Sequence, residues 1–192
     1  MQQITVQPQR MATKLLRERI ETALDTLLPY FKITAEELRR FNKPGIRRVL
    51  QPDEHPDHSR TSPGYSHIGN FFYFPLRDPG LLTHIFSEVT INHEVSHDIH
   101  GSINPEMIRG QEIRVRTGKW PLGYHALSEV VADYVNIILE LYTPEEQMFR
   151  AFRESKEIYD KYGPEFLPRL SRMSLQEAIE EGVVDIQASA ES

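Results

Sequence analysis

The chain has 192 residues and a formal net charge of −6, from 22 Lys and Arg against 28 Asp and Glu. This length suits one domain with a hydrophobic core, and a content of 39% hydrophobic residues argues against wholesale disorder. The acidic balance argues against a nucleic-acid partner. The chain has no cysteine, which excludes disulfides, thiolate metal ligands and a cysteine nucleophile. Any bound metal must therefore be held by His, Asp and Glu side chains.

Signals for export or membrane insertion are not evident in the sequence. The N-terminal residues contain no uninterrupted apolar run of the kind found in a secretory signal. The most apolar stretch, residues 130–142, is short for a bilayer span and is interrupted by Asp133, Asn136 and Glu140. We therefore expect a cytoplasmic protein that does not contact a membrane.

Two helices are predicted within residues 11–50, after a loose N-terminus at residues 1–10. Apolar residues recur at helical spacing over residues 11–30, with charged residues between them. Thr34 and Glu37 have the spacing of a capping box, in which each side chain accepts a hydrogen bond from the other residue's backbone N–H. This pair predicts the start of the second helix.

The middle of the chain is predicted to contain a strand and a long helix. The aromatic segment at residues 67–76 is the clearest strand candidate, and Pro75 suggests a place at or near a sheet edge. The long helix is expected to start at Asp78 as its N-cap and to stop at Gly101.

The rest of the chain is predicted to be a connection followed by helices. The expected elements are a connection at residues 102–123 with a short strand at 112–116, helices at 124–141 and 143–162, and a last short helix capped by Ser174 and Glu177. The predicted fold class is therefore α+β, mostly helical with a small sheet. We expect one domain over residues 1–192, with a core at residues 65–141 and C-terminal helices and a tail at residues 143–192.

The string from His93 to His97 has the pattern H-E-x-x-H within a predicted helix. A helix advances about 6 Å over four residues, so His93 and His97 leave the same face and can reach a single ion. Glu94 is rotated by about 100° from His93 and lies beside the ion, where a base can accept a proton from water. The alternative is a buried helix whose histidines bond to neighbouring residues without a metal.

A catalytic zinc takes three protein ligands, so a third must come from elsewhere in the chain. The metzincin continuation of the motif is absent, because position 103 is Ile, and His100 lies about 10 Å of helix rise from His93. Glu129 and Asp133 are one turn apart in a helix that is otherwise rich in aliphatic residues. Two carboxylates in such a place require a partner, and a metal with its histidine ligand would provide one.

This arrangement resembles the gluzincin metallopeptidases, the thermolysin-like clan, in a minimal single-domain form. In that clan H-E-x-x-H is followed on a second helix by a Glu ligand and, four residues later, by an Asp. The Glu-Val-Val-Ala-Asp string also resembles the E-x-x-A-D form of small gluzincin families such as the ImmA/IrrE-like regulatory peptidases.

The resemblance implies a zincin-like fold with two metal-bearing helices and a function for each matched residue. His93, His97 and Glu129 would bind one Zn²⁺, Glu94 would be the general base, and Asp133 would orient His93 by accepting its ring N–H. The implied substrate is a peptide or protein. The clan's substrate-binding edge strand would correspond to Asn70, Phe71, Phe72 and Tyr73, a match that rests on order in the chain and aromatic content.

Other functions remain open at this stage. The same fold could bind metal as a regulatory or interaction module without turnover, although such a module has no need of Glu94. The peptidase could also be latent, with the acidic segment 180–192 in its own site. Tyr124, His125 and Tyr134 lie near the third ligand, and no spacing rule selects one of them as the group that stabilises the oxyanion.

Overall fold

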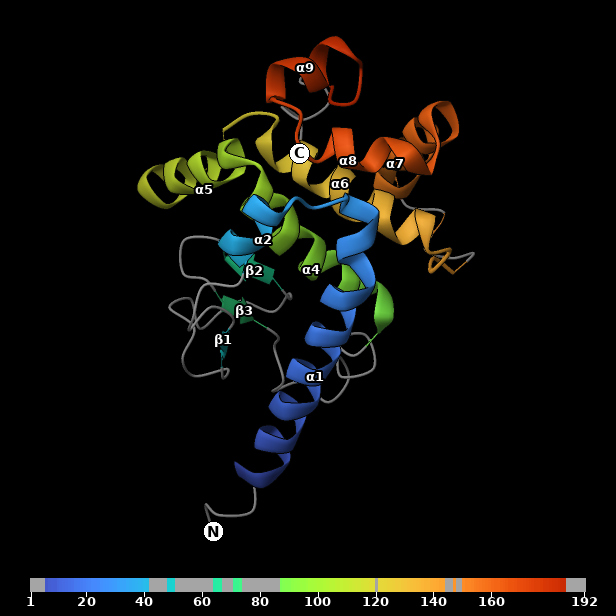
Figure 1. The fold of residues 1–192 in the computed structure, drawn as a ribbon. Helices are drawn as coiled ribbons and strands as arrows, with labels where there is room; N and C mark the ends of the chain where they lie inside the picture. The colour runs from blue at the N-terminus through green and yellow to red at the C-terminus, as the bar shows by residue number, and fades with distance from the viewer. Residues whose placement is uncertain are drawn as a thin grey trace.

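The computed structural model describes residues 6–41, 48–50, 64–66, 71–73, 87–119, 121–143, 147 and 150–185. This part of the chain is mostly helical, as predicted (Figure 1). Its α-helices are α1 (Val6–Phe31), α2 (Ala35–Phe41), α4 (Glu88–Ile103), α5 (Pro105–Thr117), α6 (Tyr124–Ile138), α7 (Arg150–Tyr162), α8 (Leu167–Leu170) and α9 (Leu175–Glu180), with a 3₁₀ turn, η2 (Pro164–Phe166).

The β-structure consists of three strands of three residues each, β1 (Arg48–Leu50), β2 (Gly64–Ser66) and β3 (Phe71–Tyr73). They pair in the order β1-β3-β2, with β1 parallel and β2 antiparallel to β3. The strand predicted at residues 67–76 is therefore present as β3. It is the central strand and not itself an edge, but among the described strands both its neighbours, β1 and β2, are edges, which agrees with a place near an edge.

Helix α4 is the centre of the fold. It packs most extensively against α6, and it also contacts α1, α5, α2 and β2 (Figure 1). Eleven of its 16 residues are buried, which exceeds the single buried face of a surface helix. A helix enclosed in this way is fixed in position and rotation, so side chains on it and on α6 face each other in a defined register.

The start of the chain differs from prediction. Helix α1 begins at Val6, so residues 6–10 are helical where a loose end was expected, and residues 1–5 lie outside the described part. The predicted capping box of α2 is confirmed: the backbone N–H of Thr34 donates to Glu37 Oε2 at 2.8 Å, and that of Glu37 donates to Thr34 Oγ1 at 3.2 Å.

The helix with the histidines starts later and ends later than predicted. Its N-cap is Ser87, which is extended (φ −65°, ψ 146°) and accepts a hydrogen bond from the Thr90 backbone N–H. The prediction of one helix continuous from Asp78 is therefore wrong, although residues 74–86 themselves lie outside the described part of the chain. Gly101 does not stop the helix, which continues to Ile103 because Asn104 supplies the terminus instead.

Residues 112–116, predicted as a strand in a connection, lie in helix α5. The Asn104 side chain caps this helix by accepting from the Glu106 backbone N–H, and Pro105 occupies its first position. The same Asn104 ends α4, and its amide donates to the Met173 carbonyl oxygen at 2.9 Å. One residue thus sets the turn between two helices and ties it to the C-terminal part of the chain.

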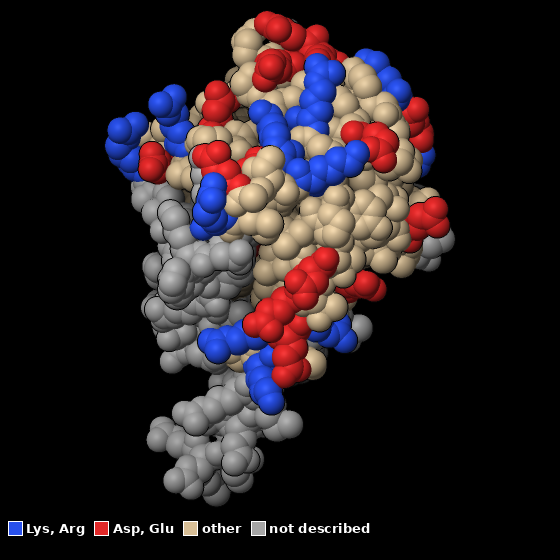
Figure 2. Space-filling view, viewed as in Figure 1, with Lys and Arg blue, Asp and Glu red and all other residues tan. Residues whose placement is uncertain are grey.

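Acidic and basic side chains are interspersed on the face shown in Figure 2. Glu18, Glu21 and Asp25 are exposed and follow one another at helical spacing along α1. Among the described helices, none combines the length and the apolar character needed to cross a membrane.

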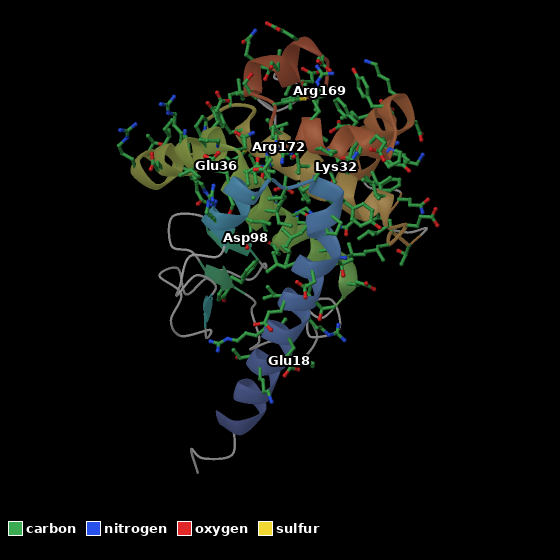
Figure 3. The ribbon with its side chains drawn as sticks, in the orientation of Figure 1. Glu18, Lys32, Glu36, Asp98, Arg169 and Arg172 are labelled. Atoms are coloured by element: carbon green, nitrogen blue, oxygen red, sulfur yellow. The ribbon has the colours of Figure 1, made fainter. Side chains whose placement is uncertain are left out.

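Arg172 connects the C-terminal segment to the junction of α1 and α2 (Figure 3). Its Nε and one terminal nitrogen donate to the two Glu37 carboxylate oxygens, each at 2.9 Å, and its other terminal nitrogen donates to the Phe31 carbonyl oxygen. Burial disfavours ionisation of Glu37, but hydrogen bonds from Arg172 and Thr34 outweigh it and lower the pKa of Glu37 from 4.5 to about 2.

This pair predicts an acid-dependent loss of stability. Because the pKa of Glu37 is lowered on folding, its contribution is complete above pH 4.5 and disappears as the pH falls toward 2. The contribution is about 2 to 3 kcal/mol, reduced by solvent around the partly exposed Arg172. Urea unfolding between pH 7 and pH 3 should show the gap between wild type and Glu37→Gln closing. The exposed neighbour Glu36→Gln is the control, and a gap that does not change with pH would contradict the assignment.

Candidate metal centre

The candidate metal centre lies where α4 faces α6. His93 and His97 are one turn apart on α4, and their rings meet edge to face with centroids 4.7 Å apart. Glu129 lies on α6, which begins after Gly123 (φ 84°). This positive φ favours glycine at the start of the helix, and a Cβ at position 123 would also displace a Leu175 methyl group, which would lie 2.9 Å from it.

The structure brings together the three predicted ligands. His93 Nε2 and His97 Nε2 are 3.1 Å apart. The Glu129 carboxylate completes the group, with Oε2 at 3.2 Å from His93 Nε2 and Oε1 at 3.4 Å from His97 Nε2. Ligand atoms at tetrahedral zinc, with bonds of about 2.0–2.1 Å, are about 3.3 Å from one another. The His93–His97 separation is close to this value, and one ligand atom from each of the three residues lies within 4.8 Å of the others, so together they could hold one metal ion. Among the described residues this is the one group of three His, Asp or Glu side chains so placed.

The protonation of the rings also favours a cation at this point. Asp133 Oδ1 lies 3.4 Å from His93 Nδ1, which biases that nitrogen toward carrying the proton and leaves the lone pair of a neutral ring on Nε2. Nε2 then faces a carboxylate oxygen of Glu129, and two lone pairs repel unless a proton or metal ion lies between them. Three electron-pair donors converging on one point are the donor set of a metal ion.

The electrostatics agree with this reading. Burial lowers the pKa of His93, but hydrogen bonds to Asp133 and Glu129 outweigh it and raise that pKa well above its usual value. Burial likewise raises the pKa of Glu129, and hydrogen bonds from His93 and His97 outweigh it and lower the pKa well below its usual value. The site thus favours positive charge between the rings and the carboxylate, whether a proton or a metal supplies it.

Each histidine has a further contact that fixes its ring. Asp133, predicted to orient His93, lies beside His93 and accepts a hydrogen bond of 2.5 Å from the Tyr142 hydroxyl. His97 Nδ1 lies 2.8 Å from Ser128 Oγ. Ser128 and Tyr142 were not predicted, because neither belongs to a spacing pattern. The packing of α6 on α4 brings Ser128 to His97, and the chain beyond α6 brings Tyr142 to Asp133. Such contacts hold ligand rings in place and raise metal affinity.

Glu94, predicted to be the general base, is buried on α4 next to His93 in the sequence. It is 7% exposed, and its charge contributes to the raised pKa of His93, so it lies close to the first ligand without belonging to the group of three. Its assignment as the general base stays a prediction.

The proposed substrate strand is described only in part. Asn70 lies outside the described residues, and Phe71–Tyr73 form β3, with Phe72 and Tyr73 buried. Strands β1 and β2 pair with β3 on its two sides, so over these residues the backbone of β3 is paired within the sheet. The assignment of residues 70–73 to substrate binding stays a prediction.

The predicted latent tail is also described in part. The Glu181 carboxylate pairs with Arg169, Val183 and Val184 are buried, and the backbone N–H groups of both valines donate to the Ala178 carbonyl oxygen. Residues 181–185 are thus anchored on α8 and α9. The hypothesis of a blocking tail therefore concerns residues 186–192, which are not among the described residues.

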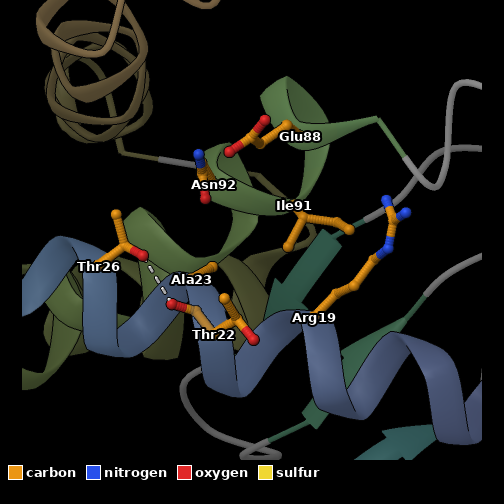
Figure 4. A pocket seen from close by; sticks show the side chains of 7 residues that line it. All are labelled: Arg19, Thr22, Ala23, Thr26, Glu88, Ile91 and Asn92. Atoms are coloured by element: carbon orange, nitrogen blue, oxygen red, sulfur yellow. Dashed lines mark hydrogen bonds between the residues drawn. The ribbon is translucent and has the colours of Figure 1, made fainter.

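A cavity of about 230 Å³ lies between α1 and α4, away from the candidate metal centre. Figure 4 shows Arg19 reaching over it from α1 and Glu88, Ile91 and Asn92 facing it from α4. At 100° per residue, these α4 positions are on the side of the helix opposite to His93 and His97. This cavity is therefore separate from the three metal ligands.

Comparison with known proteins adds no identity. No family model matches the chain, and neither the curated proteins nor the solved structures contain a match.

Proposed function

We propose that this protein is a zinc-dependent peptidase with its active site at His93, His97 and Glu129. One observation supports the proposal above all others. Two imidazole nitrogens lie 3.1 Å apart, and the two oxygens of one carboxylate lie 3.2 Å and 3.4 Å from them, so three residues offer ligand atoms to one ion. Three protein ligands leave a fourth position for water or substrate, which distinguishes a catalytic zinc from a structural one.

Zinc bound by these residues would lower the pKa of water to about 7 and polarise a peptide carbonyl. Asp133 and Ser128 would hold the two histidine rings so that their Nε2 lone pairs remain directed at the ion. Glu94 would accept a proton from water as it attacks the carbonyl carbon and would donate it to the leaving amine when the C–N bond breaks. Glu94 alone would therefore carry the proton from water to the leaving amine, and no second acid is required.

The alternative of a metal-binding module without turnover is less well supported. A module that only holds metal needs the three ligands and the residues that hold the ligand side chains in place. It does not need a carboxylate at position 94, and a buried carboxylate costs free energy unless it is compensated. The presence of Glu94 at 7% exposure therefore favours an enzyme.

The proposal predicts that hydrolysis depends on one zinc ion per chain. Protein purified without chelators should contain about one equivalent of zinc and cleave members of a broad peptide library. Removal of the metal with a chelator should abolish cleavage, and one equivalent of zinc should restore it. Cleavage that survives removal of the metal, or a zinc-loaded protein that cleaves no member of the library, would contradict the proposal.

A further inference from the structure

His125 is the one residue of Tyr124, His125 and Tyr134 that contacts the candidate metal centre. The Tyr134 ring is fully buried, and its hydroxyl donates to the Gly163 carbonyl oxygen at 2.7 Å. The Tyr124 ring packs on Gly110, where an added Cβ would lie 2.8 Å from it. His125 Nε2, by contrast, lies 3.3 Å from Oε1 of Glu129, one helical turn further along α6.

The two oxygens of the Glu129 carboxylate have different neighbours. Oε2 is the oxygen near His93 Nε2, whereas Oε1 is near both His97 Nε2 and His125 Nε2. A carboxylate that binds zinc through one oxygen leaves the other to accept a hydrogen bond. A His125 ring protonated on Nε2 can donate that bond.

We propose that His125 is a positioning residue, which holds Glu129 in single-oxygen coordination by donating its Nε2–H to the carboxylate. Helix α6 then supplies the third ligand and also one residue that contacts each ligand side chain. These pairs are Asp133 with His93, Ser128 with His97 and His125 with Glu129. The inference rests on the proposed zinc site and extends it to a residue that the H-E-x-x-H and E-x-x-x-D patterns do not contain.

The need for such a contact follows from the exposure of the ligands. The side chain is 13% exposed at His97 and 22% at His93, but 34% at Glu129. Glu129 is also the ligand with the most rotatable bonds, so it loses the most side-chain entropy when it is fixed. His125 is itself 55% exposed and lies on the solvent side of Glu129. It can therefore restrict the most mobile ligand without being required for the core.

The test uses the full-length protein loaded with Zn²⁺ or Co²⁺ and three variants. His125→Ala should bind zinc about 10-fold to 100-fold more weakly in competition with a chromophoric chelator, the usual effect of removing an outer contact of a ligand. The visible absorption of the Co²⁺ form should also change, because a carboxylate free to bind through both oxygens raises the coordination number. His125→Gln retains an N–H donor and should recover most of the affinity and the spectrum. Tyr124→Phe, at the neighbouring position, should leave both unchanged.

The possible failures are distinguishable. A wild-type protein that binds neither ion with a defined stoichiometry would refute the proposed zinc site itself. A wild-type protein that binds one equivalent, with His125→Ala equal to it in affinity and Co²⁺ spectrum, would overturn only the function proposed for His125. Circular dichroism of each variant checks that the helices are retained, which is expected because the His125 side chain is half exposed.

Discussion

Glu94→Gln is expected to lower the rate of peptide hydrolysis by about 100-fold to 10,000-fold while the protein keeps its zinc. The amide has nearly the size and shape of the carboxylate, so the buried position remains filled. It cannot accept a proton from water, however, which removes the general base from the proposed reaction. Zinc should stay bound because Glu94 is not one of the three ligands.

The measurement combines a kinetic assay with metal analysis of the same sample. Glu112→Gln on α5 is the matched control, since it makes the same chemical change at an exposed position away from α4 and should leave the rate unchanged. Hydrolysis by Glu94→Gln at the wild-type rate would refute the assignment of the base. Loss of zinc together with activity would mean that Glu94 belongs to the ligand set.

Glu129→Ala is expected to remove the zinc and the stabilisation that zinc provides. A ligand present at 100 times its dissociation constant stabilises the folded state by about 2.7 kcal/mol, which corresponds to about 5 to 10 °C in Tm for a chain of this size. Wild-type Tm should therefore rise when zinc is added to the metal-free protein, and Tm of the variant should not. Calorimetry with and without zinc, together with metal analysis, measures both effects.

Glu21→Ala provides the control for this substitution. Glu21 and Asp25 have the same E-x-x-x-D spacing as Glu129 and Asp133, but they are exposed on α1. The variant should bind zinc and gain stability from it as the wild type does. If Glu129→Ala retained equimolar zinc with an unchanged rise in Tm, the third ligand would have to be another residue.

The sequence was sufficient to predict the ligands because helix geometry is local. Four-residue spacing determines that His93 and His97 share a face of α4, and that Glu129 and Asp133 share a face of α6. What the spacing could not establish is that the two faces meet. That depends on how α4 and α6 pack, and the contact of Ser128 with His97 depends on it too. Tyr142 reaches Asp133 from beyond the end of α6, and like Ser128 it was missed. His125 lies one turn from Glu129 within α6, but no spacing rule selected it.

The wrong predictions about the fold have similar causes. Residues 112–116 alternate between charged and aliphatic side chains, a strand-like pattern, but the cap at Asn104 and Pro105 fixes a helix that includes them. Gly101 is a common helix terminator, yet it is buried inside α4, where packing outweighs intrinsic preference. The order of the three short strands depends on pairing between segments distant in sequence, which periodicity does not report.

X-ray absorption at the zinc edge of the purified protein tests the metal site most directly. If His93, His97 and Glu129 bind zinc, we expect one zinc per chain with two imidazole nitrogens at about 2.0–2.1 Å and a carboxylate oxygen at about 2.0–2.2 Å. We also expect that the imidazole scattering falls to one ring or disappears in His93→Ala. Zinc bound without imidazole scattering, or a protein that does not bind zinc in equimolar amount, would refute the proposed zinc site.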